Sequence, residues 1–173
     1  PSAILIAFFI HGLWFVGLHG ANIALPFTGT MFTNLGAQNA EMIQNGAPLD
    51  QLHVLAGPFF DAFVFMGGSG VIIGLLIAIA IAGKRRRDML ALGLAPSIFN
   101  ISEPVIFGLP IVLNPIFGIP FVIAPIVTTI ISYLSISFGL VHPIIMATMP
   151  WTTPPILGGF MATGHWSGAV LCI

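Results

Sequence analysis

The residue of this sequence that is best placed to do chemistry is a single carboxylate. Glu103 lies in the run Asn-Ile-Ser-Glu-Pro-Val-Ile-Phe-Gly, which begins at Asn100, and no Asp, Glu, Lys or Arg follows it through Ile173. An ionised carboxylate in apolar surroundings is costly unless another group pairs with it. We therefore expect Glu103 to belong to a functional site. The alternative is a structural cap, in which Glu103 or Asn100 satisfies backbone amides near Pro104.

Several polar and aromatic residues elsewhere in the chain could complete a site around Glu103. Carboxylate, imidazole, amide and hydroxyl groups offer donors and acceptors for the hydroxyls of a sugar, and flat aromatic rings pack on the apolar side of a sugar ring. We expect Glu103 to pair with His19 and to accept a hydroxyl proton. The expected substrate-binding residues are Asn22, Asn100 and Ser102, which support the pair, and Trp14 and Trp151, which wall the site. Each tryptophan has an alternative role as an anchor at the lipid headgroups.

The sequence offers no pattern typical of a metal or cofactor site. It contains no His-Glu-x-x-His motif and no pair of cysteines at metal-binding spacing, so neither a metal nor a cofactor is predicted. Cys172 is the sole cysteine, which excludes an intrachain disulfide.

The composition identifies an integral membrane protein. Hydrophobic residues make up 57% of the 173 residues and charged residues only 5%, whereas soluble domains carry about 25% charged residues. The mean hydropathy is +1.08. With a net charge of −1 and one short basic run, the chain lacks the basic surface that nucleic-acid binding requires.

Four apolar segments are predicted to span the bilayer, at about residues 1–22, 54–83, 118–141 and 160–173. If the first is a helix that continues through Gly20, then His11, Trp14, His19 and Asn22 share one face of it. Residues 26–52 are rich in Thr, Asn, Gln and Gly, so we expect a polar connection outside the hydrocarbon.

A re-entrant hairpin is predicted at about residues 89–117. The basic run at residues 84–87 (Lys-Arg-Arg-Arg) is expected on the cytoplasmic face, so the hairpin would enter the bilayer from the cytoplasm. Residues 89–99 reach only about 16 Å as a helix, roughly half of the hydrocarbon thickness. Pro104, Pro110 and Pro115 then disfavour one continuous helix. Irregular backbone at that depth is tolerated where it lines a water-filled cavity, so we expect the tip at residues 100–104 to do so.

The last third of the chain also contains a proline-rich stretch that is too apolar for an exposed loop. Residues 142–159 hold Pro143, Pro150, Pro154 and Pro155 around Trp151, and we expect them to fold back into the protein. The chain begins and ends inside apolar segments, which suggests a fragment of a larger transporter. The predicted fold class is thus an all-α, polytopic membrane protein with a re-entrant hairpin.

Three segments, in order, resemble the membrane component, enzyme IIC, of the bacterial phosphotransferase system, in its lactose/cellobiose/diacetylchitobiose branch. The first is Trp14 with the run Gly-Leu-His-Gly-Ala-Asn at residues 17–22. The second is the run at residues 100–115, from Asn100 to the Asn-Pro pair. The third is Pro-Trp-Thr-Thr-Pro-Pro at residues 150–155. The resemblance covers essentially the whole chain. It implies that residues 1–173 form most of the C-terminal, sugar-binding half of such a protein.

The resemblance also implies partners and roles. The residues matching Glu103 and His19 lie near the sugar 6-hydroxyl, which receives a phosphoryl group from a phosphocysteine on the cytoplasmic IIB component, itself supplied by IIA. The tryptophans matching Trp14 and Trp151 contact the sugar rings. Family members are homodimers in the bacterial plasma membrane. The donor residue lies on IIB, so it is open whether this chain should be called an enzyme.

Two other functions stay open at this point. One is a proton-coupled sugar transporter in which Glu103 and His19 carry the proton. The other is a membrane enzyme with Glu103 as base, acting on a lipid-linked substrate, although the chain lacks the acidic pair or metal site usual for that chemistry. Within the sugar hypothesis, the same hydroxyl-binding groups suit cellobiose, chitobiose or lactose.

Overall fold

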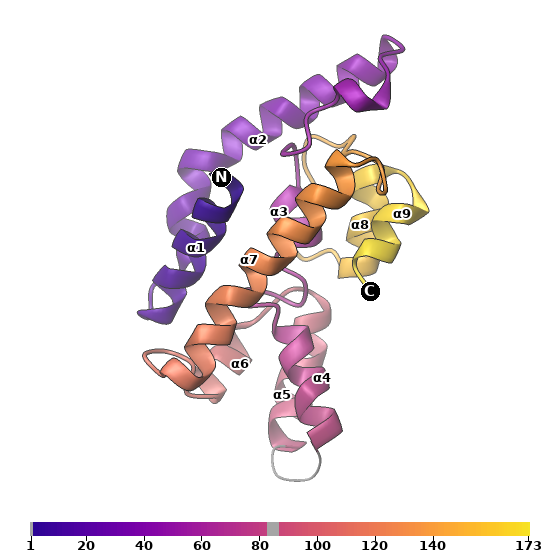
Figure 1. Cartoon of the computed structure of the whole chain (residues 1–173). Helices are drawn as coiled ribbons and strands as arrows, with labels where there is room; N and C mark the ends of the chain where they lie inside the picture. The colour runs from indigo at the N-terminus through magenta and orange to yellow at the C-terminus, as the bar shows by residue number, and fades with distance from the viewer. Residues whose placement is uncertain (1, 83–86) are drawn as a thin grey trace.

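The computed structural model describes residues 2–82 and 87–173, and every regular element in these two ranges is a helix (Figure 1). The predicted all-α fold class is confirmed. The elements are α1 Ser2–Phe15, α2 Gly20–Gln44, the short 3-10 helix η1 Leu49–Gln51, α3 Phe59–Phe63, α4 Ile72–Ala82, α5 Arg87–Ile98, α6 Glu103–Gly108, α7 Pro115–Ser137, α8 Pro155–Thr163 and α9 Trp166–Leu171.

The first predicted span contains two helices, so the condition of one helix through Gly20 is not met. α1 ends at Phe15, the chain turns with Gly17 at φ +89°, and α2 starts at Gly20. A Cβ atom at Gly20 would collide with the carbonyl group of Ile10, so glycine is required where α2 crosses α1. The turn leaves His19 at the N-terminus of α2 instead of on a continuous helix face.

The predicted polar connection at residues 26–52 is also wrong over most of its length, because α2 continues to Gln44. Its polar residues include Asn39, which is fully buried and fully hydrogen-bonded. The Asn39 amide donates to the carbonyl oxygens of His53 and Ile144 and accepts from the His53 N–H, each at 2.8 Å. Tertiary contacts of this kind override the weak helix propensity of the segment.

The second predicted span, residues 54–83, is interrupted between α3 and α4. The backbone at residues 64–71 is irregular, with φ of +75° at Gly67 and +99° at Gly68. This interruption, here called the glycine loop, packs against the hairpin: a Cβ at Gly68 would meet Ser102 and the Asn100 carbonyl. A straight helix could not bring its backbone so close to that tip.

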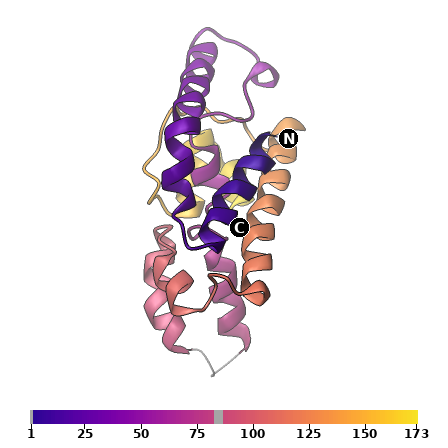
Figure 2. The same ribbon diagram turned by 90° about the vertical axis from the view of Figure 1, so that its left-hand side faces the viewer.

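Within residues 89–117, predicted above as a re-entrant hairpin, the chain reverses between α5 and α6. α4 and α5 lie side by side, and the short α6 follows beside α5 (Figures 1 and 2). The hairpin returns to α1 through the Leu113 N–H, which donates to the Phe15 carbonyl at 2.9 Å. The basic run at residues 84–87, used above to orient the chain, lies outside the described residues except for the backbone of Arg87.

α7 is a long helix in the middle of the molecule; α2 extends beyond one of its ends, and α4 and α5 extend beyond the other (Figures 1 and 2). In the described ranges α7 is the one helix that is long and apolar enough to cross a bilayer, with 23 residues and a mean hydropathy of 2.0. It packs along α1, where Gly118 lies against the Phe15 ring. α1, α4 and α5 are shorter apolar helices.

The proline-rich stretch forms no regular element from His142 to Pro154, and α8 begins at Pro155. Pro is well suited to a first helical position, where its missing N–H costs nothing. The stretch folds back on α8, because the Ile145 N–H donates to the Ala162 carbonyl at 2.9 Å.

We expect Gly68→Ala to destabilise the protein, by about 1 to 3 kcal/mol. The added methyl group would press on Ser102, and φ at this position is unfavourable for alanine. Gly74→Ala, in α4, is the matched control because a Cβ there meets nothing within 4 Å. Thermal unfolding in detergent, followed by circular dichroism, measures the difference, and equal midpoints for both variants would contradict the close packing.

Candidate functional site

One pocket is lined by all seven residues that the sequence analysis selected for the site. It encloses about 740 Å³ of space not occupied by protein atoms, including its open mouth. The lining residues are Trp14, His19, Ala21, Asn22, Leu25, Asp61, Phe65, Ser69, Asn100, Ser102, Glu103 and Trp151. They come from α1, the start of α2, α3, the glycine loop, the hairpin tip and the proline-rich stretch, so tertiary folding assembles the site. We call it the first pocket.

His19 and Glu103 face each other in the first pocket. His19 Nε2 lies 3.5 Å from Glu103 Oε1, and the two side chains are 39% and 40% exposed. His19 Nδ1 accepts a hydrogen bond of 3.2 Å from the backbone N–H of Asn22, which caps α2. Because Nδ1 acts as an acceptor, neutral His19 carries its proton on Nε2. The imidazole therefore points an N–H group toward the carboxylate.

The aromatic residues form two different parts of the wall. Trp14 is only 3% exposed, and its ring lies 4.3 Å from that of His19 between centroids, tilted by 47°. Trp151 is 56% exposed and comes from the proline-rich stretch. Trp14 thus supports the imidazole from the protein side, whereas the Trp151 ring is free to meet a ligand.

Asn100 ties together three segments that surround the pocket. Its Oδ1 accepts from the Gly67 N–H, and its Nδ2 donates to the carbonyls of Trp151 and Thr153, each at 2.9 Å. Both amide hydrogens are used by the protein, so the structure favours the structural alternative for this side chain. Asn100 adopts φ +61°, a left-handed conformation that asparagine tolerates better than most residues.

Ser102 and Asn22 keep hydrogen-bonding capacity for a ligand. Ser102 Oγ accepts from the Ser69 N–H at 3.2 Å, which leaves its own hydroxyl hydrogen available. Asn22 is exposed, and within the described part of the chain its side chain makes no hydrogen bond. Both can serve in binding, as the sequence analysis expects.

Sequence reasoning missed Asp61, which adds a second carboxylate to the first pocket. It also gave no role to Ser69, Phe65 or Leu25. The signal for Asp61 was present, because it is an acidic residue in an apolar segment, the argument that selected Glu103.

His11 is excluded from the site. It was expected on the same helix face as Trp14, but it is fully buried between the rings of Phe65 and Phe121. Its Nδ1 lies 2.7 Å from the Ala7 carbonyl. The two other groups on that predicted face, His19 and Asn22, reach the pocket only because the chain turns after Phe15.

Comparison with known proteins decides the family. The family model described as phosphotransferase system, EIIC, matches residues 1–125. The chain belongs to the EIIC family. Similar curated proteins are the cellobiose-specific EIIC component of Lactococcus lactis, 42% identical over 99% of the chain, and the oligo-beta-mannoside-specific EIIC component of Bacillus subtilis, 41% identical over 99%. The chain spans about 39% of the length of each.

A solved structure of the family has the same fold. It is the transporter ChbC, the IIC component of the N,N'-diacetylchitobiose-specific phosphotransferase system. The TM-score is 0.91 at 35% identity, over 98% of this chain and 40% of that one. The resemblance seen in the sequence is therefore confirmed at the level of family and fold.

Replacing Asn100 by Gly should destabilise the protein by about 2 to 4 kcal/mol, since three hydrogen bonds are lost while the left-handed backbone stays permitted. Asn22→Ala is the control, because its side chain makes no hydrogen bond in the described structure. Thermal unfolding of both variants in detergent provides the comparison. An Asn100→Gly protein as stable as Asn22→Ala would show that the tip is held by something else.

Proposed function

We propose that this chain is the sugar-binding part of a phosphotransferase permease, which binds a disaccharide and translocates it coupled to phosphorylation of its 6-hydroxyl. The observation that carries the proposal is the His19–Glu103 pair, 3.5 Å apart, inside a pocket walled by Trp14 and Trp151. The names of the relatives, which include cellobiose-specific, oligo-beta-mannoside-specific and lactose-specific components, support a sugar of this class.

The pair suits activation of a hydroxyl group. Because Nε2 and Oε1 are 3.5 Å apart, a hydroxyl oxygen can lie within hydrogen-bond distance, about 2.8 Å, of both. Glu103 would accept the hydroxyl proton, and the His19 N–H would donate to the oxygen and orient it. Phosphoryl transfer depends mainly on positioning and on stabilising charge, so an oriented hydroxyl is the contribution required of this chain.

The phosphoryl group has to come from a partner. All four basic residues of the sequence lie at residues 84–87, and the residues lining the first pocket include no cation other than His19 if protonated. A nucleotide could not be held there. As the resemblance implies, the donor is a phosphocysteine on a cytoplasmic IIB component, which IIA recharges.

The surroundings are proposed to be the bacterial plasma membrane, crossed several times in the intact protein. The outer side of α7 exposes a row of large apolar side chains, which a bilayer or another subunit would cover. They include Ile116, Ile119, Ile123, Val127, Ile130 and Leu134. We propose that the intact protein is a homodimer, as the resemblance implies. We also propose that its basic run at residues 84–87 lies on the cytoplasmic side of the membrane.

Membrane vesicles that contain the intact protein test the coupling. With IIB and its phosphodonors inside, we expect sugar phosphate to accumulate and uptake to be indifferent to a protonophore. Free sugar inside, with uptake abolished by the protonophore, would instead establish the proton-coupled alternative and overturn the proposal.

Glu103→Gln should lower the rate of sugar phosphorylation by about 100-fold, because the amide cannot take the hydroxyl proton. Sugar binding, measured by tryptophan fluorescence, should change much less, since Gln still accepts a hydrogen bond. Glu41→Gln, an exposed carboxylate of α2 outside the pocket, is the matched control. A folded Glu103→Gln protein that phosphorylates sugar at the normal rate would remove Glu103 from the mechanism.

A further inference from the structure

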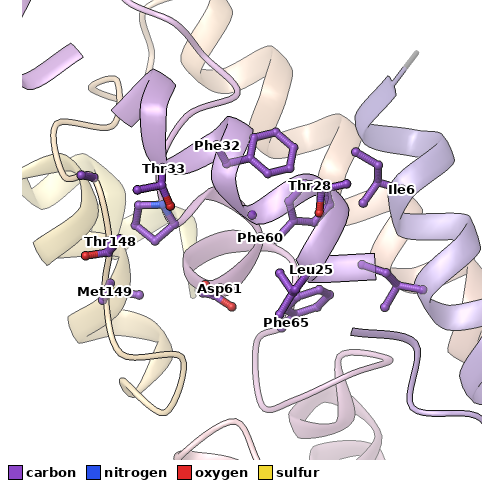
Figure 3. A pocket seen from close by; sticks show the side chains of 15 residues that line it. Ile6, Leu25, Thr28, Phe32, Thr33, Phe60, Asp61, Phe65, Thr148 and Met149 are labelled. Carbon is purple, nitrogen blue, oxygen red and sulfur yellow. The ribbon is translucent and has the colours of Figure 1, made fainter. Parts of the chain in front are cut away.

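A second pocket lies directly beside the first and has about 610 Å³ of space, including its mouth (Figure 3). Its walls come from α1, α2, α3 and the proline-rich stretch. The residues lining it are Ile6, Ile10, Leu25, Thr28, Gly29, Phe32, Thr33, Gly57, Pro58, Phe60, Asp61, Phe65, Ala147, Thr148 and Met149. We call it the adjoining pocket.

We propose that the adjoining pocket is a second carbohydrate subsite, which takes an additional unit of a sugar chain longer than the disaccharide in the first pocket. The inference rests on the proposed function, because the first pocket must hold a sugar for the second to extend it. It assigns to Asp61 the role of a specificity residue shared by both subsites.

Three residues line both pockets, so the two pockets are adjacent. They are Leu25, Asp61 and Phe65. Figure 3 shows Asp61 and Phe65 close to Leu25 at one end of the adjoining pocket. A sugar chain whose reacting end lies at Glu103 and His19 would reach the adjoining pocket past these shared residues.

The polar groups of the adjoining pocket suit hydroxyl groups. Asp61 and Thr33 have side chains that make no hydrogen bond within residues 2–82 and 87–173. The Thr28 hydroxyl donates to the Ala24 carbonyl at 3.1 Å, so toward a ligand it can act as an acceptor. Figure 3 places the two threonines, on α2, across from Asp61, on α3. A purely apolar ligand would leave the carboxylate without a partner.

The apolar part of the wall suits a sugar ring. The rings of Phe32, Phe60 and Phe65 lie in sequence, with centroid distances of 5.4 Å from Phe32 to Phe60 and 5.9 Å from Phe60 to Phe65. Aromatic faces bind the C–H side of a pyranose while its hydroxyls meet polar groups. A neutral ring rich in hydroxyls satisfies both kinds of wall, whereas an anionic ligand would be repelled by Asp61.

A larger side chain at position 29 would fill the adjoining pocket and leave the first pocket unchanged. A Cβ atom at Gly29 would meet nothing within 4 Å, and Gly29 lines only the adjoining pocket of the two. A leucine at this position in α2 would project into the space that the extra sugar unit needs. Gly12→Leu is the matched control: it is also helical, also meets nothing within 4 Å, and lines neither pocket.

The experiment measures binding of paired sugars to the intact protein in detergent, by tryptophan fluorescence. The pairs are cellobiose with cellotriose, mannobiose with mannotriose, and diacetylchitobiose with triacetylchitotriose. For the pair that binds, we expect Gly29→Leu to lower the affinity for the trisaccharide about tenfold or more and the affinity for the disaccharide less than about twofold. Gly12→Leu should change neither. Thr33→Val, which removes one hydroxyl and keeps the volume, should weaken the trisaccharide selectively as well.

The outcomes separate the two proposals. Two results would overturn the second subsite alone. One is that the disaccharide binds and the trisaccharide does not. The other is that neither Gly29→Leu nor Thr33→Val changes the affinity for the trisaccharide. Equal loss of both sugars in both variants would also overturn the second subsite, because the adjoining pocket would then be no separate site. If no sugar binds the unsubstituted protein, the proposed function fails and the subsite fails with it.

Discussion

The site depends on the hydrogen bonds of one buried amide. The Asn100 side chain connects the tip of the hairpin to the glycine loop through Gly67, and to the proline-rich stretch through the carbonyls of Trp151 and Thr153. These three segments are all irregular, and irregular backbone needs partners for its polar groups wherever water is excluded. The Asn100 side chain supplies three of these partners and so ties together the segments that carry Glu103 and Trp151.

The second requirement is a break in each of the first two apolar segments. Because of the turn after Phe15, His19 lies at the N-cap of α2 and its Nδ1 accepts from a backbone N–H. The Nε2–H of the ring therefore faces Glu103. The glycine loop after α3 lets backbone approach Ser102 closely. Both breaks cost helical hydrogen bonds, and at the glycine loop the backbone N–H groups of Gly67 and Ser69 instead donate to Asn100 and Ser102, which line the first pocket. The two interruptions of the helices thus lie beside the first pocket and supply part of its lining.

The largest errors of sequence interpretation were made where long-range contacts decide the local structure. Residues 26–44 look like a polar loop because Thr, Asn, Gln and Gly are weak helix formers. They are helical because Asn39 is satisfied by His53 and Ile144, and because Gly36 lies against Met146. None of these partners is near in sequence. Asp61 was overlooked for a different reason: an acidic residue in an apolar segment was visible in the sequence, but only the fold places it in the wall of the first pocket.

The sequence by itself determined the all-α membrane class and the EIIC family, and it predicted seven residues that line one pocket. It could do so because composition, hydropathy and residue type are local properties, and because an isolated carboxylate in apolar surroundings needs a function or a partner. Only the tertiary structure decided which side chains face the first pocket, which hold the backbone and which are buried. The reason is that folding distributes hydrogen-bond partners and burial: the amide of Asn100 is used by the protein and His11 is fully buried, while Asp61 lines both pockets.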